Sequence, residues 1–225
     1  MARSVVVLGH RGGRGEGFPP ENTLAAFERA LAIGVDFVEL DVRASSDGEL
    51  VVFHDARLDR LTPLRGPLGR RTAAELAEHA IPTLAQVLEL CRGRAGVMAE
   101  LKSPHLYRRH ELVARTVAMV DPDADIVLSF QRGALLEARG LSPRLRILQH
   151  VGYGVSIRAA ARYANLVGFA DGRVTRRGLE KARSLGLATT VYTVNDETRM
   201  RELAAADVDG IISDRPDRLL AVLGR

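Results

Sequence analysis

Residues 8–55 contain the motifs that decide how this chain folds. They read Gly9-His10-Arg11-Gly12, then Pro20-Glu21-Asn22-Thr23, then Val38-Glu39-Leu40-Asp41-Val42, and finally Val51-Val52-Phe53-His54-Asp55. The apolar residues of these motifs form short runs that are typical of buried parallel strands. Imidazole and charged side chains are costly to place beside such strands unless they converge on a ligand. We therefore expect the histidines, the arginine and the acids of this stretch to meet at one site.

Short apolar runs and helix-like segments continue to alternate as far as the C-terminus. We predict strands at residues 5–8, 36–43, 96–102, 126–129, 146–149, 165–168, 188–193 and 210–213. Helical segments between them imply a parallel sheet with helical crossovers. About eight such units close into a (β/α)8 barrel, the TIM barrel. An open, doubly wound sheet is the alternative, but the first turn lacks the glycine fingerprint of dinucleotide-binding folds.

Several local features complete this expectation. Asn22 is a favourable N-cap for a helix over residues 23–33, and a single helix is expected over residues 107–120. Residues 57–80 are polar and weakly periodic, so we interpret them as a short insertion after the second strand. No linker, internal repeat or low-complexity tract interrupts the sequence. We therefore assign residues 1–225 to one domain.

The composition indicates an ordinary globular protein. The chain is 46% hydrophobic and 27% charged, with a net charge of +4. Its arginines are spread along predicted helices without interleaved aromatic residues, so we expect no nucleic-acid partner, although the charge suits an anionic small molecule. The single cysteine, Cys91, excludes an internal disulfide. No apolar run approaches about 20 residues, and no signal-peptide pattern is present. We expect a cytoplasmic protein without stable membrane anchoring; any oligomeric partner is unknown.

Three acids are expected to share the mouth of the barrel, which the carboxyl ends of the strands form. Glu39 and Asp41 lie on one face of the second strand, and Glu100 lies on the third. Each close pair of like charges costs about 4 kcal/mol at an effective dielectric of about 20. Either a proton is retained, or a cation lies among the acids, or each acid pairs elsewhere with an arginine. Oxygen ligands alone suit Mg²⁺ or Ca²⁺, so we expect one divalent cation.

His10 and His54 each follow an apolar strand and precede a charged residue. An imidazole near its ordinary pKa can give or accept a proton at neutral pH. The two could therefore act as general base and general acid at a phosphodiester, and we favour His10 as the base. His150 also follows a predicted strand and could reach the mouth, but a structural role is favoured for it.

Arg11 and Lys102 would supply positive charge to the same site. Arginine binds phosphate through paired hydrogen bonds, whereas lysine acts as a compact point charge. Only one other lysine, Lys181, occurs in this arginine-rich chain. A lysine beside Glu100 therefore suggests a site that is too tight for a guanidinium group.

Together these motifs closely resemble the glycerophosphodiester phosphodiesterase family. Further matching segments are Ile81-Pro82-Thr83-Leu84, Glu100-Leu101-Lys102, Tyr192-Thr193-Val194-Asn195 and Asp209-Gly210-Ile211-Ile212-Ser213-Asp214-Arg215-Pro216. The resemblance covers nearly the whole chain and implies a (β/α)8 barrel. It also implies metal-dependent hydrolysis of glycerophosphodiesters to glycerol 3-phosphate and an alcohol, within lipid and glycerol metabolism.

The resemblance further implies a role for each site residue. Glu39, Asp41 and Glu100 would bind the metal, His10 and His54 would be the catalytic pair, Arg11 and Lys102 would bind the phosphate, and Tyr192 would lie in the substrate pocket. The family often has tryptophan in place of Tyr192. The short insertion implies an open mouth that accepts varied alcohols. The nucleophile is either the substrate's own 2-hydroxyl or water.

Two rival functions fit the sequence less well. A related phosphodiesterase that acts on lysophospholipids, or less plausibly on phosphoinositides, would need an apolar rim at the mouth. The six Phe and four Tyr residues form no clear patch of that kind. A non-catalytic barrel that binds phosphorylated metabolites should have lost a histidine or an acid, yet all seven polar groups are present.

Overall fold

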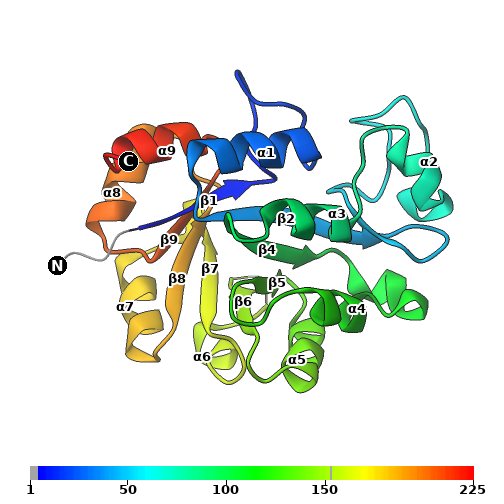
Figure 1. Cartoon of the computed structure of the whole chain (residues 1–225). Coiled ribbons are helices and arrows are strands. Elements are labelled where there is room, and N and C mark those ends of the chain that lie inside the picture. Colours follow the sequence, from blue (N-terminus) through cyan, green and yellow to red (C-terminus); the bar gives the residue numbers. More distant parts are fainter. Residues whose placement is uncertain (1–4, 153) are drawn as a thin grey trace.

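Eight parallel strands form a closed barrel in the computed structural model, which describes residues 5–152 and 154–225 (Figure 1). The strands are β1 (Val6–His10), β2 (Phe37–Ala44), β4 (Gly96–Leu101), β5 (Ile126–Ser129), β6 (Arg146–His150), β7 (Leu166–Ala170), β8 (Ala188–Tyr192) and β9 (Gly210–Ser213). Strand β1 pairs in parallel with both β9 and β2, which closes the ring. The predicted TIM barrel is confirmed, and an open sheet is excluded.

Helices surround the barrel (Figure 1). They are α1 (Leu24–Ile33), α3 (Leu84–Cys91), α4 (Leu112–Met119), α5 (Arg132–Leu141), α6 (Ile157–Ala160), α7 (Arg176–Ser184), α8 (Glu197–Ala205) and α9 (Pro216–Val222). Side chains fix where several of them begin. Thr23, Thr83 and Thr175 each accept a hydrogen bond from the backbone N–H three residues later, which satisfies a donor that the helix itself cannot.

The alternation of side chains along β2 separates the core from the mouth. Val38, Leu40 and Val42 belong to the main core, between the barrel and its helices. Glu39 and Asp41 project from the opposite face of the strand, into the barrel. A second apolar cluster is separate from this main core; it contains Leu8, Met98, Ile126, Leu128, Leu148 and Ile212. Two of its members pair in register with the acids, Met98 opposite Glu39 and Leu128 opposite Glu100.

The insertion after the second barrel strand has its own small core. Strand β3 (Leu50–Val52) pairs antiparallel with β2, and the short helix α2 (Ala73–Ala77) follows (Figure 1). Residues Val51, Phe53, Leu58, Leu68, Leu76 and Ile81 pack together beneath this segment. The excursion is thus anchored by burial of apolar side chains, and it holds the segment after β3 against the barrel.

Two local predictions were wrong. Thr23 and not Asn22 caps α1, whose first residue is Leu24. Asn22 has a φ of 59°, a left-handed conformation that asparagine tolerates. The helix predicted over residues 107–120 is also interrupted. Glu111, with a φ of 50°, separates a 3₁₀ segment (Pro104–His110) from α4.

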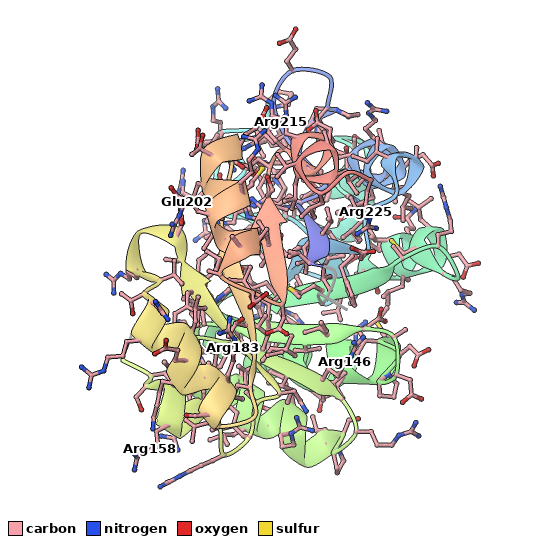
Figure 2. All side chains as sticks on the ribbon, turned by 90° about the vertical axis from the view of Figure 1, so that its left-hand side faces the viewer. Arg146, Arg158, Arg183, Glu202, Arg215 and Arg225 are labelled. Carbon is pink, nitrogen blue, oxygen red and sulfur yellow. The ribbon has the colours of Figure 1, made fainter. Side chains whose placement is uncertain are left out.

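Charged side chains lie on the outer helices (Figure 2). Arg158 on α6, Arg183 on α7 and Glu202 on α8 are all exposed. Arg183 also donates a hydrogen bond to the backbone carbonyl of Asp207, just after α8. This agrees with a solvated helical surface. Within the described residues, no helix has both the length and the apolar character that a membrane span requires.

Candidate active site

A cavity of about 180 Å³ opens at the carboxyl ends of the barrel strands. Its lining consists of His10, Arg11, Glu39, His54, Glu100, Lys102, Leu128, Phe130, His150, Tyr192, Thr193 and Ile212. These residues come from strands on all sides of the barrel and from the segment after β3. The mouth of the barrel is therefore a single polar site with an apolar base.

Glu39, Asp41 and Glu100 form an acidic triad at this mouth. Each offers a carboxylate oxygen, and these oxygens lie within 4.8 Å of one another. All three residues are buried, with Asp41 fully inaccessible to solvent. The pairing of β2 with β4 places Asp41 directly opposite Glu100. Among the described residues, no other group of three histidines, cysteines or acids lies so close together.

The acids alter one another's protonation. Burial, and then the charge of Asp41, raise the pKa of Glu39 to about 7. Burial also raises the pKa of Glu100, although the ammonium group of Lys102 opposes this effect. The pKa of Asp41 is lowered, because Lys102 and Arg11 outweigh the effect of its burial. Asp41 therefore ionises more readily than the other two acids of the triad.

The acidic triad fits a hard divalent cation. Its donors are carboxylate oxygens alone, which suit Mg²⁺ or Ca²⁺ better than metals that prefer sulfur. The buried Oδ1 atom of Asp41 accepts no hydrogen bond from the part of the chain that the structure describes. Nζ of Lys102 lies 3.0 Å from it as an ion pair, but without hydrogen-bond geometry. A bound cation would also supply the charge that Glu39 and Glu100 lack.

His10 is held by Asp214, which follows β9. Its Nδ1 atom lies 2.7 Å from Oδ1 of Asp214. An ionised carboxylate only accepts, so Nδ1 carries the proton, and Nε2 lies 3.9 Å from Oε2 of Glu39. Asn195 donates a hydrogen bond of 2.8 Å to the other oxygen of Asp214. Burial lowers the pKa of His10, but the Asp214 hydrogen bond and the charge of Glu39 outweigh it, and the pKa is raised.

His54 is held in a similar way by its neighbour Asp55. Its Nδ1 atom lies 2.7 Å from Oδ1 of Asp55. Arg43 donates two hydrogen bonds, of 3.0 and 2.6 Å, to the backbone carbonyl of His54. Burial lowers the pKa of His54. The charge of Asp41 opposes this effect, but burial together with the charge of Lys102 outweighs it. The ring is therefore fixed through both its backbone and Nδ1.

Arg11 contacts acids through its backbone and its side chain. Its backbone N–H donates to Oε2 of Glu39 over 3.1 Å, and its Nη1 donates to Glu21 over 2.8 Å. Its Nε atom lies 3.2 Å from Oδ2 of Asp41. Asn22 donates a hydrogen bond of 2.7 Å to the same Asp41 oxygen. The turn after β1 therefore orients Asp41 within the acidic triad.

Phe130, His150 and Tyr192 form an aromatic wall of the cavity. The His150 ring lies between the other two, with centroid distances of 4.3 Å to Phe130 and 4.1 Å to Tyr192. Gly168 leaves room for the imidazole, because any side chain there would collide with it. Burial, with a contribution from the charge of Lys102, lowers the pKa of His150 to about 3. His150 is therefore a neutral ring that lines the cavity. The sequence favoured a purely structural role for it.

The structure brings the sequence-predicted site residues together around one cavity. Seven of them line it: His10, Arg11, Glu39, His54, Glu100, Lys102 and Tyr192. The eighth, Asp41, lies behind this lining and contacts Arg11 and Lys102.

Five polar residues that touch the site were missed. They are Glu21, Asn22, Asp55, Asn195 and Asp214. All belong to motifs that the sequence analysis quotes, and all lie in connections that follow a strand, which was the available signal. Local periodicity gives no sign that Asp214 lies beside His10, which is 204 positions away.

Known proteins that resemble this chain over nearly its whole length belong to the family that the motifs suggest. Residues 10–218 match the model of the glycerophosphoryl diester phosphodiesterase family. The glycerophosphodiester phosphodiesterase of Bacillus altitudinis is 31% identical over 243 residues, which cover 96% of this chain and 97% of that protein.

Solved structures are similar as well. The glycerophosphodiester phosphodiesterase of Agrobacterium tumefaciens has 33% identity and a TM-score of 0.77, and the match covers 96% of this chain and 99% of that one. A phosphodiesterase of Oleispira antarctica, solved in complex with the product sn-glycerol-3-phosphate, has 26% identity and a TM-score of 0.86, with coverage of 98% and 97%. The barrel, the site and these matches agree, and the chain belongs to the glycerophosphoryl diester phosphodiesterase family of phosphoric diester hydrolases.

Proposed function

We propose that this enzyme hydrolyses glycerophosphodiesters to glycerol 3-phosphate and an alcohol, with one Mg²⁺ or Ca²⁺ ion held by Glu39, Asp41 and Glu100. One observation carries the proposal: Glu39 and Glu100 of the acidic triad line the same cavity as two imidazoles, each held by an aspartate. The product bound to the Oleispira relative supports the choice of substrate class. When bound, the cation would polarise a phosphoryl oxygen and stabilise negative charge that develops on it.

Arg11 and Lys102 are the proposed phosphate ligands. Nζ of Lys102 has three N–H donors and contacts two carboxylates, Glu100 at 2.8 Å and Asp41 at 3.0 Å. At least one of its N–H donors is therefore available to a phosphate oxygen in the cavity. Arg11 directs Nη1 and Nε at acids, which leaves Nη2 for the phosphate. Donors fixed in this way stabilise the charge of the transition state without having to reorganise.

His10 and His54 are the proposed proton-transfer groups. In both rings Nδ1 donates to an aspartate, so Nε2 is the atom that accepts or gives a proton. The pKa of His10 is raised and that of His54 is lowered, so burial and the charges of the metal-free protein favour the reverse of the order expected from the sequence. A cation beside Glu39 would act against the rise at His10, because its charge disfavours the imidazolium form. The order of the two transfers thus depends on the charge that the acidic triad holds.

An activity assay with and without chelator tests the proposal. Hydrolysis of glycerophosphocholine should cease on chelation and return with Mg²⁺ or Ca²⁺. His10→Ala and His54→Ala should each lower kcat by about 100-fold or more, the range for a lost general acid or base. His105→Ala, which removes an exposed histidine, is the control and should be fully active. Metal-independent turnover, or full activity in His10→Ala, would contradict the assignment.

Two further substrates distinguish the remaining alternatives. An analogue that lacks the 2-hydroxyl should be inert if that hydroxyl is the nucleophile, and should turn over rapidly if water attacks directly. A lysophosphatidylcholine tests the lysophospholipase D-like alternative. The cavity of about 180 Å³ favours small polar diesters, so we expect the lysolipid to be the poorer substrate.

A further inference from the structure

The buried carboxylate of Glu21 has no role in the proposed chemistry, yet it binds three arginines. The side chain is only 2% exposed. It accepts hydrogen bonds from Arg11 at 2.8 Å, from Arg60 at 2.8 Å and from Arg14 at 3.4 Å. Burial raises the pKa of Glu21, but Arg60 and Arg11 outweigh it and the pKa is lowered. Glu21 is therefore a buried anion shared among three cations.

One of these arginines connects Glu21 to His10. Arg14 donates through Nη1 to Glu21 and through Nη2 to Oδ2 of Asp214, the latter over 2.8 Å. The other oxygen of Asp214 accepts the Nδ1 proton of His10. Arg14 is thus held between two carboxylates, and one of them fixes the imidazole.

A second arginine connects Glu21 to His54. Arg60 donates through Nη2 to Glu21 over 2.8 Å and through Nε to Oδ2 of Asp55 over 2.7 Å. The other oxygen of Asp55 accepts the Nδ1 proton of His54. The two halves of the site therefore have the same arrangement. In each, an imidazole donates to an aspartate, and an arginine donates to both that aspartate and Glu21.

These links run between parts of the chain that are far apart in the sequence. His10 ends β1 and Asp214 follows β9, whereas His54 and Arg60 belong to the insertion after β2. Glu21 lies in the connection between β1 and α1 and joins both groups. We propose that Glu21 is a positioning residue that fixes both imidazoles at once, through the Arg14–Asp214 pair on one side and the Arg60–Asp55 pair on the other. This rests on the proposed function, in which His10 and His54 transfer the protons.

The proposal predicts a specific pattern among three variants. Glu21→Gln keeps one oxygen but turns the other acceptor into a donor that faces guanidinium groups, so both imidazoles should be disturbed. Arg14→Gln should disturb only His10, and Arg60→Gln only His54. The side chains of Arg14 and Arg60 are nearly half exposed, at 49% and 45%, so these variants should fold. A carboxylate that merely balances charge would not give this pattern.

The direct measurement is ¹⁵N NMR of the histidine ring nitrogens in the metal-free full-length chain at one fixed pH. Assignments come from His10→Gln and His54→Gln. The proton on Nδ1 gives each ring a defined tautomer, and its signal should shift for both rings in Glu21→Gln and for one ring in each arginine variant. Glu21→Asp keeps the charge but is one methylene shorter. It should shift both signals less, and it replaces Glu21→Gln if that variant does not fold.

Kinetics with Mg²⁺ or Ca²⁺ present gives the second readout. Outer partners of site residues typically contribute about tenfold to a hundredfold, and we expect kcat to fall by this factor in Glu21→Gln. Arg14→Gln and Arg60→Gln should lower kcat with little change in KM, because neither arginine lines the cavity. Glu28→Gln breaks an exposed ion pair with Arg94, and Arg57→Gln breaks one with Asp59 in the same insertion. Both controls should behave like the parent.

The two possible failures are distinguishable. If Glu21→Gln and Glu21→Asp leave both ring signals and kcat at parental values, Glu21 is not the link, even where the histidine variants are inactive. A shift confined to one ring in Glu21→Gln would equally reject a joint role. If instead His10→Ala and His54→Ala keep full activity, the proposed function fails. The ring signals would then still report whether Glu21 orients the two imidazoles.

Discussion

Nζ of Lys102 lies 2.8 Å from Oε1 of Glu100 at the carboxyl end of β4. Two other acids, Glu39 and Asp41, lie in the same mouth. Burial lowers the pKa of Lys102, but the charges of Asp41 and Glu100 outweigh it and the pKa is raised. The ammonium group is therefore charged and neutralises part of the acidic triad. It also lines the cavity, so one group serves both the acids and the space where the substrate phosphate is proposed to bind.

Replacing Lys102 with methionine should reduce turnover without abolishing metal binding. The variant keeps the aliphatic stem but removes the donor that is proposed to stabilise the phosphate charge. Loss of one such donor typically costs about 10² to 10³ in kcat. Calorimetry should show Mg²⁺ or Ca²⁺ affinity that is at least as high as in the parent, because a repelling positive charge has gone.

Two variants complete this test. Lys181→Met removes the other lysine of the chain, which is exposed on α7, and should have no effect on kcat. Lys102→Arg should also lower kcat, because the planar guanidinium group does not fit between Asp41 and Glu100. Unchanged turnover in Lys102→Arg would remove the argument that the site is too tight for arginine.

Metal binding should stabilise the fold more at pH 8 than at pH 5.5. The pKa of Glu39 is raised to about 7 from its ordinary value of 4.5, and that of Glu100 is also raised. In the folded metal-free chain Glu39 therefore holds a proton between about pH 4.5 and pH 7 that it has lost in the unfolded chain. This contribution to stability is lost as the pH rises through about 7. A cation replaces those protons, so its stabilising effect should grow with pH.

Thermal unfolding with and without Mg²⁺ or Ca²⁺ measures this effect as a difference in Tm at each pH. Taking the difference removes the contributions of groups that the cation does not touch. Glu39→Gln should show a small and nearly constant difference. A parent Tm that responds equally to the cation at both pH values would contradict a metal site in the acidic triad.

The fold and the acids could be predicted because their signals are local. Side chains alternate in and out along a strand, so Glu39 and Asp41 had to share a face, and parallel strands bring Glu100 to the same edge. The aspartate that holds His10 has no such signal. Asp214, which accepts a hydrogen bond from Asn195, reaches His10 only because the barrel closes, when β9 pairs with β1.

The error at Asn22 has a different cause. Asparagine and threonine are both favourable N-caps, and the sequence offers them in consecutive positions. Position 22 adopts a left-handed conformation and turns its amide toward Asp41, 19 residues away, where it donates a hydrogen bond. The hydrogen bond to Asp41 therefore leaves Thr23 as the N-cap. Local capping preferences give no information about that long-range contact.

His150 should make the fold less stable in mild acid. Its pKa in the folded chain is about 3, against an ordinary value of 6.5. The unfolded state therefore binds a proton between these two pH values and the folded state does not, so stability is present above pH 6.5 and is lost as the pH falls. At pH 5 this amounts to about 2 kcal/mol, since one pKa unit corresponds to about 1.4 kcal/mol.

Denaturant unfolding of the metal-free chain at pH 7 and pH 5 measures this loss. His150→Phe keeps a ring between Phe130 and Tyr192 but cannot take up a proton, so its free energy of unfolding should fall by about 2 kcal/mol less than that of the parent. His105→Phe is the control, because that histidine is exposed. The same pH dependence in His150→Phe and the parent would show that the buried imidazole is not responsible.

Tyr192 should affect substrate binding more than the chemical step. The centroid of its ring lies 4.1 Å from that of His150, and the ring lines the cavity as part of the aromatic wall. Tyr192→Ala should therefore raise KM about tenfold and change kcat little, the signature of lost uniform binding. Tyr192→Trp keeps an aromatic face against His150 and should stay near the parent, whereas Tyr192→Phe isolates the hydroxyl group. Steady-state kinetics on glycerophosphocholine and glycerophosphoethanolamine separates these effects: a KM that does not change in Tyr192→Ala for either substrate would place the glycerophosphodiester elsewhere in the mouth.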